Sequence, residues 1–135
     1  MKIIAESLND FNLNKNVYRK IVSFIKNLKE TYPDVNLVLS VYKTENKNYT
    51  LYLDKIAIQE NNRKKGLGTE ILNKICDFCD KENIMCSLEP TDFHGSDLVR
   101  LINFYERFNF KLENKYNENS KDLTMVRCPN QIKTC

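Results

Sequence analysis

Hydrophobic residues recur at helical spacing near the start of the chain. From about residue 14 to residue 30 they stand three and four positions apart, as on one face of an amphipathic helix. These positions are Val17, Ile21, Phe24, Ile25 and Leu28. The Tyr32–Pro33 step disfavours helical geometry and is expected to end this helix. Ahead of it, residues 2–6 (KIIAE) predict a short opening strand.

The pattern changes to short apolar or alternating runs after residue 34. Residues 35–43 and 49–58 are rich in Val, Leu, Tyr and Ile, which is typical of strands, and the polar ENKN between them predicts a hairpin loop. A helical pattern then continues to about Lys81 and leads to a short apolar segment at 84–90. A strand, a helix and a second strand in this order predict a βαβ crossover.

The last third of the chain predicts one more helix and two more strands. After the loop TDFHGSD, Ser96 or Asp97 can cap a helix over residues 97–108 (DLVRLINFYERF). FKLEN and DLTMVRC then predict two strands around the polar turn KYNENS.

Length and charge limit the classes of protein that the chain can belong to. Its 135 residues suit one domain, 1–135, and 29% charged residues with a net charge of +3 are ordinary for a soluble globule. No apolar run approaches the length of a membrane span or a secretory signal, so a cytoplasmic monomer or homodimer without a membrane partner is expected. The mild basic excess favours an anionic small ligand over nucleic acid, which is not expected as a partner.

The five cysteines are expected to be reduced, because their number is odd and no export signal precedes them. Cys76 and Cys79 form a CxxC pair inside the second helical pattern, where core packing is favoured over zinc or redox chemistry. No metal site is expected. His94, the only histidine, lies in a loop beside Asp92 and Asp97 without a recognisable metal or catalytic register.

Two of the three glycines stand between a predicted strand and a predicted helix, in NNRKKGLGTEIL (61–72). Gly66 and Gly68 allow unusual torsions and a close approach of backbone amides to an anion. Arg63, Lys64 and Lys65 add positive charge where the helix dipole already favours a negative ligand. A solvated loop remains the simpler reading of this stretch alone. A Walker loop and a dinucleotide fingerprint are excluded, since neither spacing is present.

The segment RKKGLG, after LDKIAI and before TEIL, resembles the acyl-CoA pyrophosphate loop of the GNAT superfamily of N-acetyltransferases. A second motif of that family, a helix that ends in an aromatic pair and leads into a strand, is matched by residues 104–110 (FYERFNF). Asn109 replaces the usual glycine of this motif, and asparagine is among the few residues that accept a left-handed conformation.

The resemblance implies an α+β, three-layer fold. Its mixed, mostly antiparallel sheet would have about six to seven strands and a βαβ crossover that binds CoA. The strand before the loop would bind the pantetheine arm through the backbone of residues 56–58, and residues 63–69 would hold the pyrophosphate. The implied acetyl-CoA contacts are Ile56, Ala57, Ile58, Arg63, Lys64, Lys65, Gly66, Leu67, Gly68 and Thr69. Where relatives often place a pantetheine-binding Asn, this chain has Leu98, so Asn103 or Ser96 is the candidate substitute.

Two residues match the family's proton-transfer groups. Asp54 corresponds to a general base, and its position two residues before Ile56 predicts that both lie on one strand face. A solvated or salt-bridged Asp is the alternative. Tyr105 corresponds to the tyrosine that protonates the departing thiolate, and core packing is its alternative.

The resemblance thus implies an acetyl-CoA-dependent N-acetyltransferase that acts directly on a primary amine of a small molecule or protein. A noncatalytic acyl-CoA sensor or interaction module on the same fold is the alternative, because Asp54, Leu98 and Asn109 all depart from the family pattern.

Overall fold

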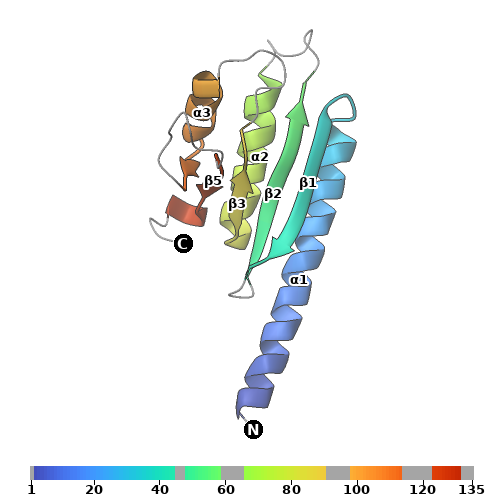
Figure 1. Cartoon of the computed structure of the whole chain (residues 1–135). Coiled ribbons are helices and arrows are strands. Elements are labelled where there is room, and N and C mark those ends of the chain that lie inside the picture. The colour runs from blue at the N-terminus through green and yellow to red at the C-terminus, as the bar shows by residue number, and fades with distance from the viewer. Residues whose placement is uncertain (1, 45–47, 59–65, 91–97, 114–122, 132–135) are drawn as a thin grey trace.

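The computed structural model describes residues 2–44, 48–58, 66–90, 98–113 and 123–131. These residues form three α-helices, five strands and a short 3-10 helix, with all five strands in one sheet (Figure 1). Within the described ranges, none of the helices is apolar over a length that would cross a membrane.

The first helix, α1, spans Lys2–Thr31 and is much longer than predicted. Its second half carries the expected apolar stripe, with Ile21 and Leu28 buried, and it ends just before Tyr32 and Pro33. The predicted strand at residues 2–6 is wrong, because these residues are the first turns of α1. The stretch before residue 14 contains neither glycine nor proline, and a short apolar run does not distinguish a strand from a helix. In Figure 1, this first part of α1 extends beyond the sheet.

The sheet has the order β1-β2-β3-β5-β4 and is antiparallel except between β2 and β3. Its strands are β1 (Asn36–Lys43), β2 (Tyr49–Ala57), β3 (Met85–Leu88), β4 (Lys111–Leu112) and β5 (Met125–Arg127). The helix α2 (Leu67–Glu82) connects the parallel pair and forms the predicted βαβ crossover. The α+β class and the mixed, mostly antiparallel sheet are confirmed, with five described strands instead of six to seven.

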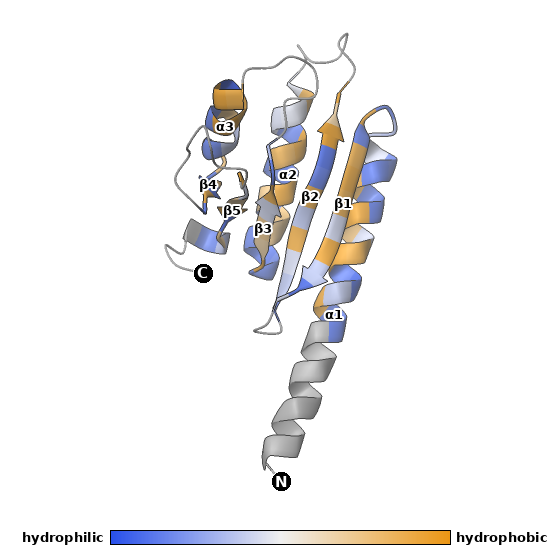
Figure 2. Cartoon of the chain, in the orientation of Figure 1, coloured by the Kyte–Doolittle hydropathy of each residue, from blue (hydrophilic) through white to orange (hydrophobic). Residues whose placement is uncertain are grey.

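One face of the sheet forms the core with α1 and α2. Side chains at alternate strand positions are buried there, and Figure 2 shows hydrophobic and hydrophilic residues following one another along β2. These strand residues are Leu37, Leu39, Leu51, Leu53, Cys86, Leu88 and Met125. Phe24 of α1 stacks on Phe78 of α2 with 4.1 Å between ring centroids, so both helices cover this same face. We call the opposite face the outer face of the sheet.

The third helix, α3, spans Leu98–Glu106 and buries Ile102 and Tyr105 in the same core. Cys76 and Cys79 are free and buried on α2, which confirms that this CxxC pair packs in the core. Burial raises the pKa of the Cys76 thiol to about 12, so it stays neutral. Cys128 is disulfide-bonded, contrary to the expectation that all five cysteines are reduced.

Candidate functional site

Asp54 lies on the outer face of the sheet, at a β-bulge in β2. Val38 pairs with Lys55 and Leu39 pairs with Leu53, so Asp54 is the extra residue of the longer strand. Its carboxylate accepts a 2.8 Å hydrogen bond from the hydroxyl of Ser40, whose side chain alternates with the buried Leu39. Asp54 therefore lies on the face away from α1 and α2.

The same bulge returns Ile56 to the core face. Ile56 pairs with the buried Leu37 and packs against the core cluster. Asp54 and Ile56 thus point to opposite faces, although they are two residues apart. The expectation that they share a face is wrong, because it assumed an unbroken alternation along the strand.

The pairing of β2 with β3 ends before the pairing of β2 with β1. The parallel ladder runs from Thr50–Met85 to Leu53–Leu88, whereas the antiparallel ladder continues to Ala57–Asn36. The last residues of β2 therefore extend past the end of β3's ladder. An extended ligand can add to a strand edge of this kind through main-chain hydrogen bonds.

The N-terminus of α2 lies next to this strand edge. Gly66 is the N-cap residue and has left-handed torsions, φ 70° and ψ 21°, which glycine adopts at no steric cost. The amide of Glu70 donates to the Gly66 carbonyl at 3.0 Å and closes the first turn. Among the described residues, no side chain caps this end, so the amides of the first turn have no side-chain acceptor there.

Gly68 contributes space rather than unusual torsions. It lies inside α2, and among the glycines described only Gly66 has a positive φ. A Cβ at residue 68 would lie 3.6 Å from Cδ1 of Ile58 and 3.8 Å from Cζ of Phe104. The residue after β2, the first turn of α2 and the last turn of α3 therefore meet at Gly68. Thr69, in the same first turn, is exposed.

Tyr105 is buried where α3 meets the sheet. Its ring makes edge contacts with Phe104 and Phe110, at centroid distances of 5.5 and 6.0 Å. Burial raises the pKa of the Tyr105 hydroxyl to about 12, and the nearby Cys86 thiol adds to the shift. The hydroxyl is thus a proton-bearing hydrogen-bond donor throughout the neutral range.

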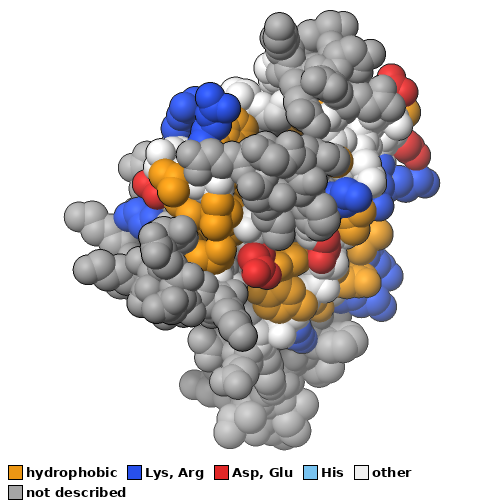
Figure 3. All heavy atoms as spheres, turned by 45° about the horizontal axis from the view of Figure 1, so that its top comes forward, with side chains coloured by type: hydrophobic (Ala, Val, Ile, Leu, Met, Phe, Trp, Pro, Cys, Tyr) orange, Lys and Arg blue, Asp and Glu red, His pale blue; other side chains and the backbone are white. Residues whose placement is uncertain are grey.

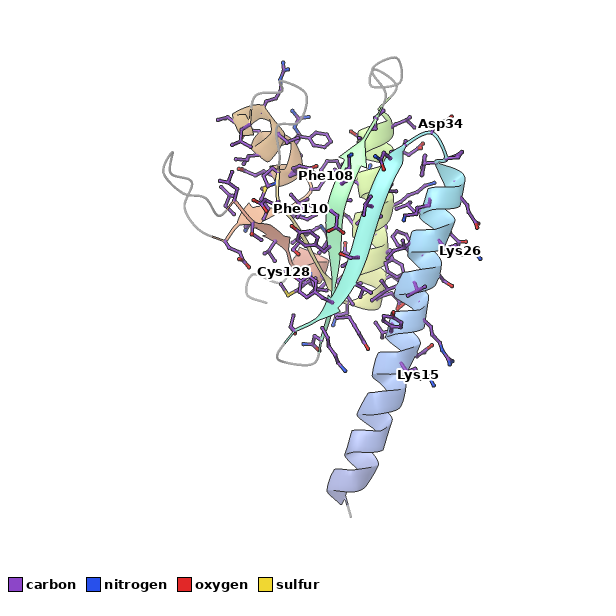
Figure 4. The ribbon with its side chains drawn as sticks, turned by 45° about the vertical axis from the view of Figure 1, so that its right-hand side comes forward. Lys15, Lys26, Asp34, Phe108, Phe110 and Cys128 are labelled. Atoms are coloured by element: carbon purple, nitrogen blue, oxygen red, sulfur yellow. The ribbon has the colours of Figure 1, made fainter. Side chains whose placement is uncertain are left out.

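The turn after α3 confirms the expectation for Asn109, which has a left-handed φ of 71°. The amides of Phe108 and Asn109 donate to the carbonyls of Tyr105 and Glu106, both at 3.0 Å, and end the helix. Phe110 then enters the core with no exposed surface. Figure 4 shows Phe108 and Phe110 among the side chains beside the strands.

Polar side chains on the outer face near Asp54 were missed by the sequence reasoning. The hydroxyls of Tyr42 and Ser87 lie 3.1 Å apart, and the rings of Tyr42 and Tyr52 are neighbours at 6.3 Å. Burial raises the pKa of Tyr52, and the charges of Glu89 and Asp54 add to this shift. The sequence did carry a signal for them, because Ser40, Tyr42 and Tyr52 alternate with apolar residues along the two strands.

The remaining predicted site residues divide into two groups. Arg63, Lys64, Lys65, His94 and Ser96 lie outside the described residues. Asn103 is exposed on α3, Leu67 is half-buried in the first turn of α2, and Ala57 and Ile58 are half-buried at the end of β2.

Comparison with known proteins agrees with this architecture. A profile of the Acetyltransferase (GNAT) family matches residues 22–110, which include β2, the whole crossover and α3. The chain belongs to this family. No curated protein matches the chain in sequence.

Three solved structures show partial similarity to the chain. Naa50 of Arabidopsis thaliana, in complex with the bisubstrate analogue CoA-Ac-MVNAL, is 22% identical with a TM-score of 0.48, over 67% of this chain and 60% of that one. Ard1 from Thermoplasma volcanium is 20% identical with a TM-score of 0.46, over 78% and 77%. Nourseothricin acetyltransferase is 21% identical with a TM-score of 0.46, over 67% and 56%. The chain thus matches less than two thirds of the length of the first and third.

Proposed function

We propose that this chain binds acetyl-CoA and transfers the acetyl group directly to a primary amine. One observation carries the proposal: α2 begins, at the left-handed Gly66, next to the end of a strand whose ladder with β3 has already stopped. Among the described residues, no side chain caps this helix end. An anionic diphosphate suits the helix N-terminus, and an extended amide-containing arm suits the strand edge. CoA carries both groups in one molecule.

The diphosphate would be bound by the first-turn amides at Gly66, Leu67 and Gly68, with Thr69 beside them. Arg63, Lys64 and Lys65, which precede this turn in sequence, would add charge. The pantetheine arm would follow the backbone at Ile56 and Ala57. In the reaction, the amine nitrogen attacks the thioester carbonyl carbon, the C–S bond breaks and CoA leaves as a thiolate.

Tyr105 would stabilise the departing thiolate. Its pKa of about 12 lies well above the value near 8.5 that is usual for a thiol, so full proton transfer to sulfur is unfavourable by about 5 kcal/mol. Donation of a hydrogen bond from the phenol carries no such cost. We therefore assign Tyr105 the role of hydrogen-bond donor, with the thiol gaining its proton from water.

Asp54 would take the proton that the attacking ammonium group must lose. Because Asp54 lies on the outer face, the acceptor amine would arrive from that side, whereas Tyr105 is packed on the core side. The base and the thiolate-stabilising group would thus act from opposite faces of the sheet. A water molecule between Asp54 and the amine suits the short side chain.

Two measurements on the purified chain test the proposal. Titration calorimetry with CoA is expected to show saturable binding, and thiol release from acetyl-CoA is expected with at least one member of a panel of primary amines. Absence of CoA binding would contradict the whole proposal. Binding without thiol release on any amine would instead favour the noncatalytic CoA-binding module.

A further inference from the structure

The outer face of the sheet near Asp54 carries two neighbouring tyrosine side chains. Tyr42 of β1 pairs with Thr50 of β2, yet its hydroxyl lies 3.1 Å from the hydroxyl of Ser87 on β3. The Tyr42 side chain therefore reaches across β2. The ring of Tyr52 lies beside it, with 6.3 Å between the ring centroids, and Tyr42 is 46% exposed. The two rings thus form an aromatic surface that is open to solvent.

Two carboxylates stand at one end of this aromatic surface. The parallel ladder of β2 and β3 ends at the buried pair Leu53–Leu88. Asp54 and Glu89 are the residues that follow on the two strands, and both are exposed. Burial raises the pKa of Tyr52, and the charges of Glu89 and Asp54 raise it further. Both carboxylates therefore lie near the Tyr52 side chain, on the outer face.

The proposed reaction uses only one of these two carboxylates. Asp54, which accepts the hydrogen bond from Ser40, is the proposed base, whereas Glu89 has no part in it. Within the described part of the chain, Glu89 forms no ion pair. Figure 3 shows Asp and Glu side chains among hydrophobic ones, which there include Tyr, in the middle of the view. Carboxylates beside an aromatic ring suit a bound ammonium group.

The spacing along the sheet leaves room for a second cationic group on the acceptor. The reacting amine has to meet the thioester at the end of β2, next to Asp54. Tyr52 stands two residues before Asp54, about 7 Å along a strand, and Glu89 stands on the neighbouring strand, about 5 Å away. An acceptor with one amine at Asp54 can therefore hold a second one, a few carbon atoms further on, between the Tyr52 ring and Glu89.

We propose that Tyr52 and Glu89 bind a second ammonium group of the acceptor, so that the chain acts preferentially on short aliphatic diamines. The second ammonium group packs on the face of the Tyr52 ring and forms an ion pair with Glu89. It stays protonated throughout, whereas the first amine loses its proton to Asp54 and attacks the thioester. The inference rests on the proposed function, since it places the reacting amine at Asp54.

The experiment compares two amines, putrescine and butylamine, which share one carbon chain and differ in the second ammonium group. The value of kcat/KM for thiol release from acetyl-CoA is measured at physiological ionic strength, where non-specific attraction is screened. Titration calorimetry on the CoA-saturated protein gives the affinity for each amine. The variants are Glu89→Gln and Tyr52→Leu, with Tyr52→Phe and Glu30→Gln as controls. Glu30→Gln makes the same chemical change at an exposed position on α1, which covers the other face of the sheet.

The wild type is expected to favour putrescine over butylamine by about tenfold or more, as hydrogen bonds to charged groups usually contribute. Glu89→Gln leaves a preference of about threefold or less, through a higher KM for putrescine, while kcat/KM for butylamine stays within about threefold. Tyr52→Leu lowers the preference about threefold, because the ring is lost. Tyr52→Phe, which keeps the ring, and Glu30→Gln keep the wild-type preference. Circular dichroism and the melting temperature show that each variant is folded.

Three results would overturn the inference while the proposed function stands. The first is a wild type whose kcat/KM for putrescine is no higher than for butylamine, absent turnover included, although another amine is acetylated. The second is a wild-type preference that survives in Glu89→Gln or Tyr52→Leu. The third is an equal loss of preference in Glu30→Gln, which would reflect the charge of the whole protein. Absence of CoA binding, or of thiol release with every amine, would overturn the proposed function itself.

Discussion

Asp54 and Ser40 face each other on the outer side of the sheet, joined by a 2.8 Å hydrogen bond from the serine hydroxyl to the carboxylate. Ser40 pairs with Tyr52, and Asp54 is the next residue of β2 on the same face, so the two side chains are diagonal neighbours across β1 and β2. The hydrogen bond holds the carboxylate on the side from which an acceptor amine would reach the end of β2. Alternation along β2 therefore sets the face of the proposed base, and the bulge changes only the face of the residues after it, Ile56 among them.

Asp54→Asn is expected to lower turnover about a hundredfold, because loss of a positioned base usually costs two to four orders of magnitude. CoA affinity should change little, since the amide keeps the shape of the carboxylate. Asp54→Glu restores the residue type of the family's base and should retain most of the activity. Steady-state thiol release with an accepted amine, together with CoA titration, gives both values. Unchanged turnover in the Asn variant would leave Asp54 with a structural role in the bulge.

Gly68→Asp is expected to weaken CoA binding at least about tenfold, because it brings a negative charge to the proposed diphosphate site. Its effect on folding should have the opposite sign. An Asp in the first turn interacts favourably with the helix dipole, and the added Cβ meets only ordinary contacts at 3.6 and 3.8 Å. The apo protein should thus melt no lower than the wild type.

The matched control for this change is Gly68→Asn, which adds nearly the same volume without charge. CoA affinity of the Asn variant should lie between those of the wild type and the Asp variant. If titration calorimetry gives the same CoA affinity for all three proteins, the first turn of α2 is not the diphosphate site.

Tyr105→Phe is expected to lower turnover about tenfold to a hundredfold, with CoA affinity retained, because only the hydrogen bond to the leaving thiolate is lost. The ring contacts with Phe104 and Phe110 remain in the Phe variant. Single-turnover thiol release and CoA titration separate the two effects. Equal activity of the variant would restrict Tyr105 to core packing.

The raised pKa of Tyr105 also predicts how stability changes in alkaline solution. The folded-state pKa is about 12 against the usual 10.0, so the folded state holds the phenol proton more tightly than the unfolded state does. The resulting contribution to the free energy of unfolding is fully present below pH 10. This contribution, about 2 to 3 kcal/mol, is lost as the pH rises from 10 to 12. Urea unfolding at pH 9 and pH 11 should therefore show a smaller alkaline loss for Tyr105→Phe than for the wild type.

The sequence predicted the parts of this protein whose signals are local. The helix α2, its buried CxxC pair and the left-handed Asn109 each follow from spacing or residue type within a few positions. The strand predicted at residues 2–6 failed because an apolar run of that length fits both a strand and a helix, and here it continues the helix that follows.

The site was harder to predict because it depends on the register between segments that are distant in the sequence. The bulge at Asp54 is defined only by the pairing of β2 with β1, and it reverses the face that alternation assigns to Ile56. The approach of Phe104 to Gly68 likewise arises from the packing of α3 against α2 and not from local spacing. Local spacing therefore identified the candidate groups without fixing which of them meet.

Arg127 and Asp80 join the last described strand to α2 and predict a stability effect separate from the site. Arg127 is buried on the core face and donates to both carboxylate oxygens of Asp80, at 2.9 and 3.0 Å, and to the carbonyl of Phe108 at 2.8 Å. Asp80→Asn leaves this buried guanidinium without its counter-ion. The free energy of unfolding should fall by about 2 to 3 kcal/mol, below the full cost of a buried pair because Asp80 is partly exposed.

The pH dependence of stability gives this pair a second signature. The hydrogen bonds from Arg127 lower the pKa of Asp80, followed by a contribution from the backbone of Asn130. A carboxyl group with a lowered folded-state pKa stabilises the fold above its usual pKa, and this contribution is lost as the pH falls through the folded-state value. Urea unfolding at pH 7 and pH 3 should show a smaller acid loss for Asp80→Asn than for the wild type. The control is Asp77→Asn, an exposed change on the same helix, which should match the wild type at both pH values. An Asp80→Asn protein as stable as this control would show that the ion pair contributes nothing net to folding.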